Sequence, residues 1–186
     1  MRFALSLWIG MVILVPGDSW DTSRAVVCKK PSSLPEPTVV QISNHKWLYD
    51  GYFTKGGVAQ LPNSAIEVLL RSHGGQMSAM REFLNKPIRR VDVFGYCDSA
   101  CAWMVAKNSN KVRLFPEVDL GFHSVGIRTF LDCKPGRLLD AKATLNLVHE
   151  LPKGLQQYLP ELHLTNDPVH IPYEVMLSEY PELSLN

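Results

Sequence analysis

The chain has 186 residues, 46% of them hydrophobic, and 19 Lys or Arg residues stand against 18 Asp or Glu. This length and apolar fraction suit one folded domain with its own core, and they exclude a disordered chain. The near-neutral balance excludes the strongly basic surface on which nucleic-acid binding depends, so we expect no nucleic-acid partner.

The amino-terminal segment has the pattern of an export signal. Arg2 precedes an apolar run over residues 3–15, and Pro16-Gly17 ends that run. This length is typical of a signal peptide and short for a membrane span. No small-x-small cleavage site follows, so an uncleaved membrane anchor and a buried first strand or helix stay open as alternatives. We expect residues 1–25 to direct export to the periplasm or medium, with membrane contact only through this segment if it is uncleaved.

A proline-rich linker over residues 26–37 is expected to connect the export segment to a folded domain, residues 38–186. The domain begins with two segments that favour strands, 38–42 and 46–50, because both are rich in β-branched or aromatic residues. Glycines after residue 50 predict turns.

The middle of the chain alternates between strand and helix patterns. Short apolar or alternating runs predict strands, and apolar residues at spacings of three and four predict helices. The expected order is a strand at 65–70, a helix at 76–86, a strand at 90–95, a helix at 99–107, and strands at 112–115 and 118–122. Such alternation predicts parallel strands with helical crossovers, and functional groups where strands end and helices begin.

The last third of the chain has weaker patterns. Residues 138–159 are expected to be mostly helical and to pack on the core, with Pro152 as a kink or boundary. The prolines from Pro160 onward predict an irregular final stretch, which is a candidate arm for a partner.

The chain has four cysteines, an even number that favours disulfides in an exported protein. We prefer Cys97 with Cys101, because residues four apart in a helical turn bring their Cα atoms to about 6 Å. Cys28 would then pair with Cys133. Two alternatives stay open, namely buried free thiols and a zinc site that uses Cys97 and Cys101 with His73 or His123.

Three segments carry groups that a serine hydrolase needs. Gly74-Gly75 follows a strand and lets a backbone N–H approach a ligand closely. Ser99 opens a helix, which places the Ala100 N–H and the positive end of the helix dipole beside it. His123 ends a strand and supplies a general base. Each also has an ordinary structural interpretation: a strand-to-helix turn, a helix N-cap and a hydrogen-bonded histidine.

The motifs also stand in a specific order. Gly74-Gly75 after a strand, then Gly95-x-x-x-Ser99, Pro116 and His123 after a short strand, resemble the Clp-type serine peptidases of the ClpP/crotonase-like superfamily. Cys97-x-Ser99-Ala100-Cys101 together with Gly121-Phe122-His123-Ser124 resembles an exported, largely uncharacterised bacterial branch of that superfamily. The resemblance spans about residues 47–124. It implies an α/β fold of repeated ββα units, with a mainly parallel sheet flanked by helices.

By this resemblance Ser99 would be the nucleophile, His123 the base, and Gly74 or Gly75 with Ala100 the oxyanion hole. The segment between residues 51 and 66 is shorter than the helix that the family has there. The family's aspartate precedes a Leu-Ser pair, and Leu177-Ser178 is preceded here by Glu174. We therefore expect Glu174 to orient His123, while Asp167 or a dyad without an acid stay open.

We expect an exported serine hydrolase, a peptidase that cleaves peptides or proteins through an acyl-enzyme at Ser99, without cofactor or metal. The alternative is a non-catalytic module of the same fold that binds a peptide or envelope component. Thioester chemistry of the crotonase type is less favoured, because export removes the chain from cytosolic acyl-CoA. The sequence carries no signal for the oligomeric state.

Overall fold

The computed structural model describes residues 34–131, 134–164 and 167–185. The expected export segment, most of the linker and the expected Cys28–Cys133 pair lie outside the described residues. Within the described ranges, no helix has the length and apolar character that a membrane crossing requires. The last residues of the expected linker contact the domain, since Pro37 is buried and Thr54 Oγ1 donates to Glu36 Oε2 at 2.6 Å.

The first part of the described chain follows the predicted alternation, except that residues 55–60, where only turns were expected, form a helix. Its elements are β1 (Thr38–Gln41), β2 (Lys46–Asp50), α1 (Lys55–Gln60), β3 (Glu67–Ser72), α2 (Met77–Leu84), β4 (Arg90–Asp98), α3 (Ala100–Lys107), η2 (Ser109–Lys111), β5 (Val112–Leu114) and β6 (Asp119–Phe122). The second part contains β7 (Gly126–Leu131), β8 (Lys134–Leu139), α4 (Ala141–His149), α5 (Lys153–Gln156), η3 (Leu162–Leu164), β9 (Val169–Ile171), α6 (Tyr173–Glu179) and η4 (Pro181–Leu183).

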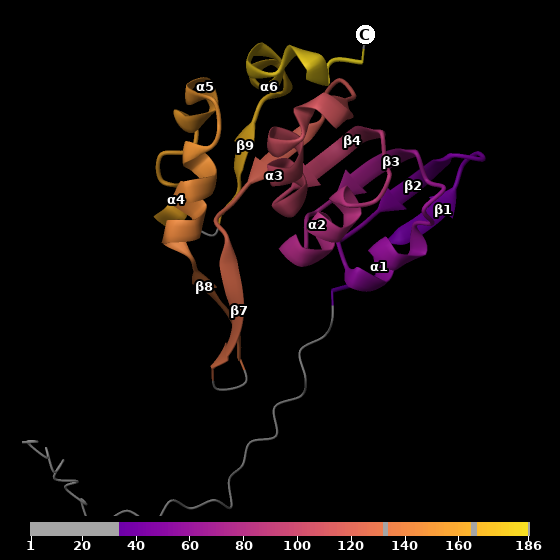
Figure 1. Ribbon diagram of the computed structural model, residues 1–186. Helices are drawn as coiled ribbons and strands as arrows, with labels where there is room; N and C mark the ends of the chain where they lie inside the picture. Colours follow the sequence, from indigo (N-terminus) through magenta and orange to yellow (C-terminus); the bar gives the residue numbers. More distant parts are fainter. Residues whose placement is uncertain (1–33, 132–133, 165–166, 186) are drawn as a thin grey trace, which may run out of the picture. The chain divides into compact units, whose positions relative to one another are not determined.

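The fold is α/β, with a mixed seven-stranded sheet flanked by helices (Figure 1). The strand order is β1-β2-β3-β4-β6-β9, and β5 also pairs with β4. Strands β2 to β6 pair in parallel, whereas β1 and β9 join the edges antiparallel. The predicted parallel centre is therefore present, and its carboxyl ends point to one edge of the sheet, where ligands of such sheets bind.

The long strand β4 pairs with different strands along its two halves. Its first half pairs with β5 through Val91–Val93, and its second half pairs with β6 through Tyr96–Asp98. Gly95, between the halves, has φ 68°, a conformation that a residue with a Cβ seldom adopts. This irregularity lets β6 run beside the end of β4 that leads into Ser99.

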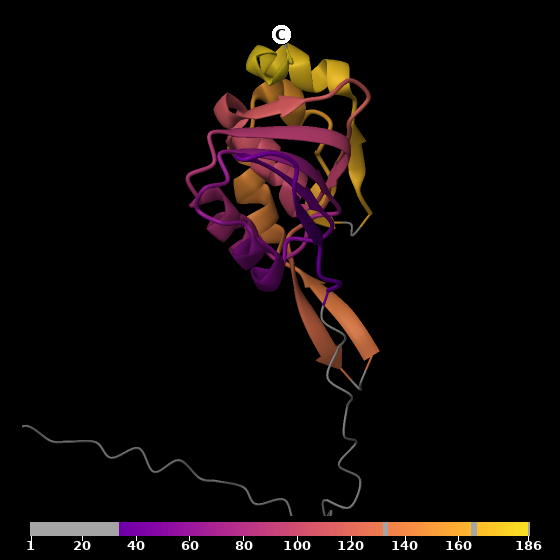
Figure 2. The same cartoon turned by 90° about the vertical axis from the view of Figure 1, so that its right-hand side faces the viewer.

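The core lies between the sheet and helices α1, α2 and α3, which cover one face of the sheet (Figures 1 and 2). Tyr49, Phe53 and Phe83 pack there with ring centroids 5.3–5.9 Å apart. Burial raises the pKa of Tyr49 to about 12. Helix α3 is buried from Ala100 to Ala106, so it is a central rather than a surface helix. The turn before α3 is consequently fixed by packing on several sides.

The opposite face of the parallel strands carries ion pairs. Along β3, buried Val68 and Leu70 alternate with half-buried Glu67 and Arg71. Arg71 Nη2 donates to Asp50 Oδ2 at 2.5 Å, and Glu67 Oε2 accepts from Arg90 Nη2 at 2.6 Å. The strand is thus amphipathic, with its apolar side toward the helices.

In the last third of the chain, the start of the predicted helix and the expected irregular end differ from the structure. Residue 138 lies in β8, which forms an antiparallel hairpin with β7, so the helix begins later than predicted. Asp140 caps α4 by accepting from Ala143 N at 2.9 Å, and Pro152 separates α4 from α5. The final stretch is also not irregular, because β9 joins the sheet and α6 follows it. The three residues between Pro168 and Pro172 are too few to show the alternation typical of a strand, and they form one because they pair with β6.

Candidate functional site

Ser99 occupies the sharp turn between β4 and α3. Its backbone has φ 56° and ψ −121°, a combination that sterics make unfavourable for any residue except glycine. The Ser99 N–H donates to Gly121 O at 2.7 Å, and its carbonyl accepts from Trp103 N at 3.1 Å. Its side chain makes no helix-capping hydrogen bond. The surrounding structure therefore holds a strained serine whose hydroxyl does not cap the helix.

Gly74 packs directly against this turn. A Cβ at Gly74 would lie 2.4 Å from the Cβ of Ser99 and 2.6 Å from the carbonyl oxygen of Asp98, so only glycine fits. Gly74 has φ 87°, and its N–H donates to Ser72 Oγ at 3.0 Å. The N–H of Gly74 is therefore used in a hydrogen bond. Its lack of a side chain allows the ends of β3 and β4 to approach each other closely.

Two other backbone amides are available beside Ser99. In the described ranges, neither Gly75 N–H nor Ala100 N–H has an acceptor at hydrogen-bond distance. The Ala100 nitrogen lies 2.9 Å from the position that a Cβ of Gly74 would take, so it adjoins the glycine pair. Gly75 (φ 129°) is held by its bridge to Phe53. Two unused donors at one strand edge can together stabilise a negative charge.

A disulfide brackets the same turn. Cys97 in β4 is joined to Cys101 in α3, with their Cα atoms 5.2 Å apart, as the spacing predicts. Both sulfurs are used in this bond, so neither is a thiolate for the alternative zinc site. The bond ties the last turn of the strand to the first turn of the helix across Ser99.

His123 follows β6 directly. The pairing of Asp98 with Gly121 places the end of β6 alongside Ser99 and the start of α3. Trp103 Nε1 donates to His123 O at 3.3 Å, which fixes the backbone there. His123 Nδ1 lies 2.9 Å from Ser124 O, and a carbonyl can only accept. The proton of this contact is therefore on Nδ1.

The structure separates Glu174 from His123, contrary to the expectation from sequence. Glu174 lines a pocket of about 350 Å³ with Glu117 and Asp119, at the amino-terminal end of β6. His123 follows the carboxyl end of the same strand. Asp167 is better placed, since β9 runs antiparallel to β6 with Val169 opposite Phe122, and Asp167 precedes Val169 by two residues.

Sequence reasoning missed a histidine–aspartate pair beside the turn. His73 Nδ1 lies 3.1 Å from Asp98 Oδ2, and the His73 ring stacks on Tyr96 at 3.9 Å between centroids. The residues are 25 positions apart, so no local period connects them. The available signal was their position, because each directly precedes a residue of the predicted site.

Arg71 packs against two aromatic rings next to His73, on the face of the sheet that carries the ion pairs. Its guanidinium lies 5.2 Å from the ring centroid of Phe94 and 5.5 Å from that of Tyr96. The hydrogen bond from Arg71 to the Asp50 carboxylate holds the pKa of Arg71 above its usual range. Arg71 therefore stays charged and supports the ring on which His73 stacks.

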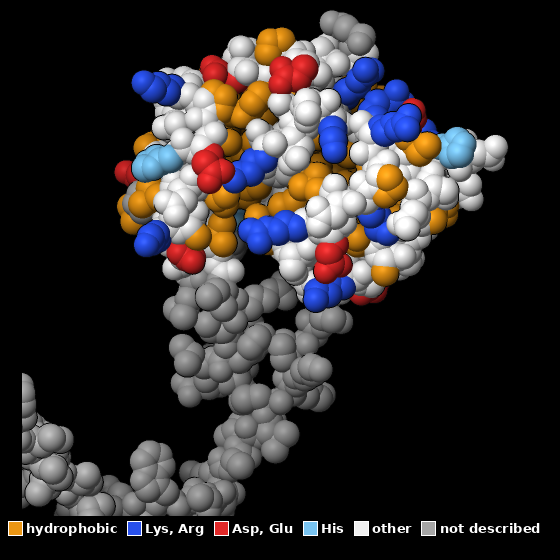
Figure 3. Space-filling model, viewed as in Figure 1, with side chains coloured by type: hydrophobic (Ala, Val, Ile, Leu, Met, Phe, Trp, Pro, Cys, Tyr) orange, Lys and Arg blue, Asp and Glu red, His pale blue; other side chains and the backbone are white. Residues whose placement is uncertain are grey.

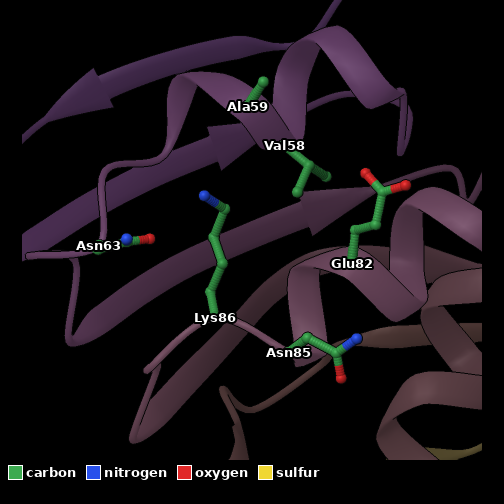
Figure 4. Close-up of a pocket in the computed structure, with 6 residues that line it drawn as sticks. All are labelled: Val58, Ala59, Asn63, Glu82, Asn85 and Lys86. Atoms are coloured by element: carbon green, nitrogen blue, oxygen red, sulfur yellow. The ribbon is translucent and has the colours of Figure 1, made fainter.

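A second pocket, of about 260 Å³, lies at the carboxyl ends of α1 and α2 (Figure 4). Its lining includes Val58, Glu82 and Lys86. Both helices begin near Gly75, so this pocket is at the end of the helix layer remote from Ser99. Around it, the helical face shows hydrophobic side chains between scattered charges of both signs (Figure 3).

Comparison with known proteins adds no assignment. No protein-family model matches the chain. A search of curated proteins also found no match.

Proposed function

We propose that this protein is an exported serine hydrolase of the ClpP/crotonase-like type, a peptidase with Ser99 as nucleophile and His123 as general base. The observation that carries the proposal is the strained backbone of Ser99, φ 56° and ψ −121°, at a strand-to-helix turn. Ser99 is half-buried, and a serine on such a turn at the edge of an α/β sheet is the arrangement of a nucleophile elbow. Non-glycine strain of this kind concentrates at functional sites.

The proposed reaction uses groups at one edge of the sheet. His123 Nε2 takes the proton of the Ser99 hydroxyl as Oγ attacks the carbonyl carbon of the substrate. The resulting oxyanion accepts hydrogen bonds from the N–H groups of Gly75 and Ala100, each worth roughly 3 kcal/mol. The protonated imidazole then gives its proton to the leaving amine, which leaves an acyl group on Ser99. Water, deprotonated by His123, releases the acid and restores the serine.

The contacts of Gly74 favour Gly75 as the proposed oxyanion donor of the glycine pair. Because the Gly74 N–H already donates to Ser72 Oγ, Gly75 is the donor and Gly74 the spacer that lets it approach. The positive end of α3 also faces Ser99, and α3 is buried where water screens little.

Asp167 replaces Glu174 as the proposed acid partner of His123. The antiparallel register of β9 on β6 supports this choice, since it brings residues before Val169 toward the end of β6 that carries His123. A carboxylate there would stabilise the imidazolium that forms during the reaction. A Ser–His dyad is the alternative outcome.

Export is supported by the Cys97–Cys101 disulfide, because such bonds persist in oxidising compartments. The parallel strands β2, β3 and β4, followed by α1, α2 and α3, support the repeated units of the proposed family. The proposed substrates are peptides or proteins outside the cytoplasm.

A fluorophosphonate probe tests the proposal, because it labels activated serines. Wild type should be labelled, and Ser99→Ala should not be labelled at all. Ser109→Ala is the matched control, since Ser109 donates to Glu182 on η4 and lies outside the proposed site. Failure of the wild type to label, where a known serine peptidase does, would favour the non-catalytic peptide-binding module.

A comparison of two carboxylate variants tests which acid, if any, assists His123. Asp167→Asn should slow labelling about tenfold or more, whereas Glu174→Gln should leave the rate unchanged. Equal rates for both variants would favour the dyad, and slowing by Glu174→Gln alone would restore the original expectation.

A further inference from the structure

His73 and Asp98 each adjoin one half of the proposed site. His73 directly precedes Gly74-Gly75 at the end of β3, and Asp98 directly precedes Ser99 at the end of β4. Their side chains meet, with Nδ1 of His73 3.1 Å from Oδ2 of Asp98. A carboxylate can only accept, so the Nδ1–H of His73 is the donor. This hydrogen bond is a side-chain link between the strand end with the oxyanion donors and the strand end with the nucleophile.

The His73 ring is fixed from two sides. It stacks on Tyr96 with an interplanar angle of 15°, and the ring of Tyr52 lies 5.7 Å away on the loop after β2. Tyr96 is itself covered by Arg71, which is held by Asp50. Although the His73 side chain is 47% exposed, its ring plane is therefore set by neighbours on β3, β4 and the loop after β2.

Asp98 depends on His73 more than a surface carboxylate would. Its Oδ1 is buried and has no hydrogen-bond partner in the part of the chain that the structure describes. Gly121 lies against that oxygen, because a Cβ at Gly121 would be 2.4 Å from Oδ1. The hydrogen bond from His73 is thus the polar contact that keeps this carboxylate inside the strand edge. Without it, the carboxylate would turn toward water and disturb the turn at Ser99.

We propose that His73 is a positioning residue, which holds the Gly75 and Ala100 amides in register with Ser99 through its hydrogen bond to Asp98. This inference rests on the proposed hydrolase function. Oxyanion donors act on the charge that develops in the transition state, so their misalignment slows the chemical step and leaves ground-state binding unchanged. A purely stabilising pair would instead lower the melting temperature without a selective effect on the reaction.

The test is the saturation kinetics of fluorophosphonate labelling with the full-length protein, which separate reversible binding of the probe from the rate of phosphonylation. His73→Ala should lower the maximal phosphonylation rate about tenfold, with an unchanged half-saturation concentration. His73→Asn, whose amide nitrogen can take the place of Nδ1, should recover most of that loss. His73→Gln places its amide near the position of Nε2 and should not.

His45→Ala is the matched control. His45 is exposed, and its Nδ1 lies 3.4 Å from Ser64 O. It directly precedes β2, at the amino-terminal end of the parallel strands, whereas Ser99 lies at their carboxyl ends. Labelling of His45→Ala should stay within about twofold of wild type.

Three results would overturn the inference: unchanged labelling of His73→Ala, equal slowing in His45→Ala, or equal rates for His73→Asn and His73→Gln. The last comparison decides the question even if His73→Ala does not fold. An unlabelled wild type would overturn the proposed function and this inference together, whereas a labelled wild type with unaffected His73 variants would overturn the inference alone.

Discussion

Two helices of the same layer begin with a hydroxyl residue, and the two hydroxyls behave differently. Thr54, before α1, has an ordinary extended backbone (φ −120°, ψ 154°), and its side chain accepts from the N–H of Gly57. Ser99, before α3, has φ 56° and ψ −121° and makes no capping bond. Thr54 is thus an N-cap in the usual sense, and Ser99 only takes the position of one.

The comparison shows how tertiary contacts keep a side chain from its usual local role. The backbone of Ser99 is held by Gly121, by α3 and by the close approach of Gly74, none of which is available at Thr54. A capping hydroxyl stabilises its own helix by a hydrogen bond to a backbone N–H, and the Ser99 hydroxyl makes no such bond.

The largest effect is expected at Gly74. Gly74→Ala would place a Cβ 2.4 Å from that of Ser99, against backbone that cannot yield, at a residue with φ 87°. We expect a loss of about 3 kcal/mol in the free energy of unfolding and about a hundredfold slower labelling. Gly95→Ala is the control, because Gly95 also has positive φ but faces only the flexible side chain of Arg71. Equal losses in both variants, measured by denaturant unfolding, would show that the close contact is unimportant.

Removal of the disulfide is expected to have the next largest effect. Cys97→Ala with Cys101→Ala removes the bond that spans Ser99. For so short a loop the free energy of unfolding should fall by about 2 kcal/mol. Labelling should slow as well, since the turn loses a constraint. Unchanged unfolding and labelling would mean that packing of α3 alone holds the turn.

Ser99→Gly is expected to stabilise the protein while it abolishes labelling. Glycine adopts φ 56° without strain, and no capping bond is lost. The expected gain is about 1 kcal/mol, measured as a higher melting temperature. Ser99→Ala separates strain from the hydroxyl, because it keeps the Cβ and should leave stability nearly unchanged. A destabilised glycine variant would show that the serine side chain has a structural role.

Thr54→Ala should have the opposite effect, with a loss of about 1 kcal/mol in stability and unchanged labelling. Its hydroxyl both accepts from Gly57 N at 2.9 Å and donates to Glu36, so the variant removes two hydrogen bonds. Thr54→Ser keeps both and should retain most of the stability. Slower labelling of Thr54→Ala would mean that the α1 cap also supports the site.

The sequence predicted the central elements well and the periphery poorly. The strand that leads to Gly74 is a short, mostly apolar run, the strand that leads to Ser99 alternates, and Pro87 marks the end of the helix between them. Strand β9, by contrast, is three residues long and exists only through its pairing with β6. The register of that pairing is also the reason why Asp167, and not Glu174, is proposed as the acid partner of His123.

Periodicity and turn chemistry are local, so the alternation of strands and helices, the position of Ser99 before a helix and the spacing of Cys97 and Cys101 could be predicted from the sequence. The strained backbone of Ser99, the hydrogen bond of the Gly74 amide and the contact of His73 with Asp98 are visible only in the folded chain. These features depend on which strand ends lie side by side, and that is fixed by packing between residues distant in the chain.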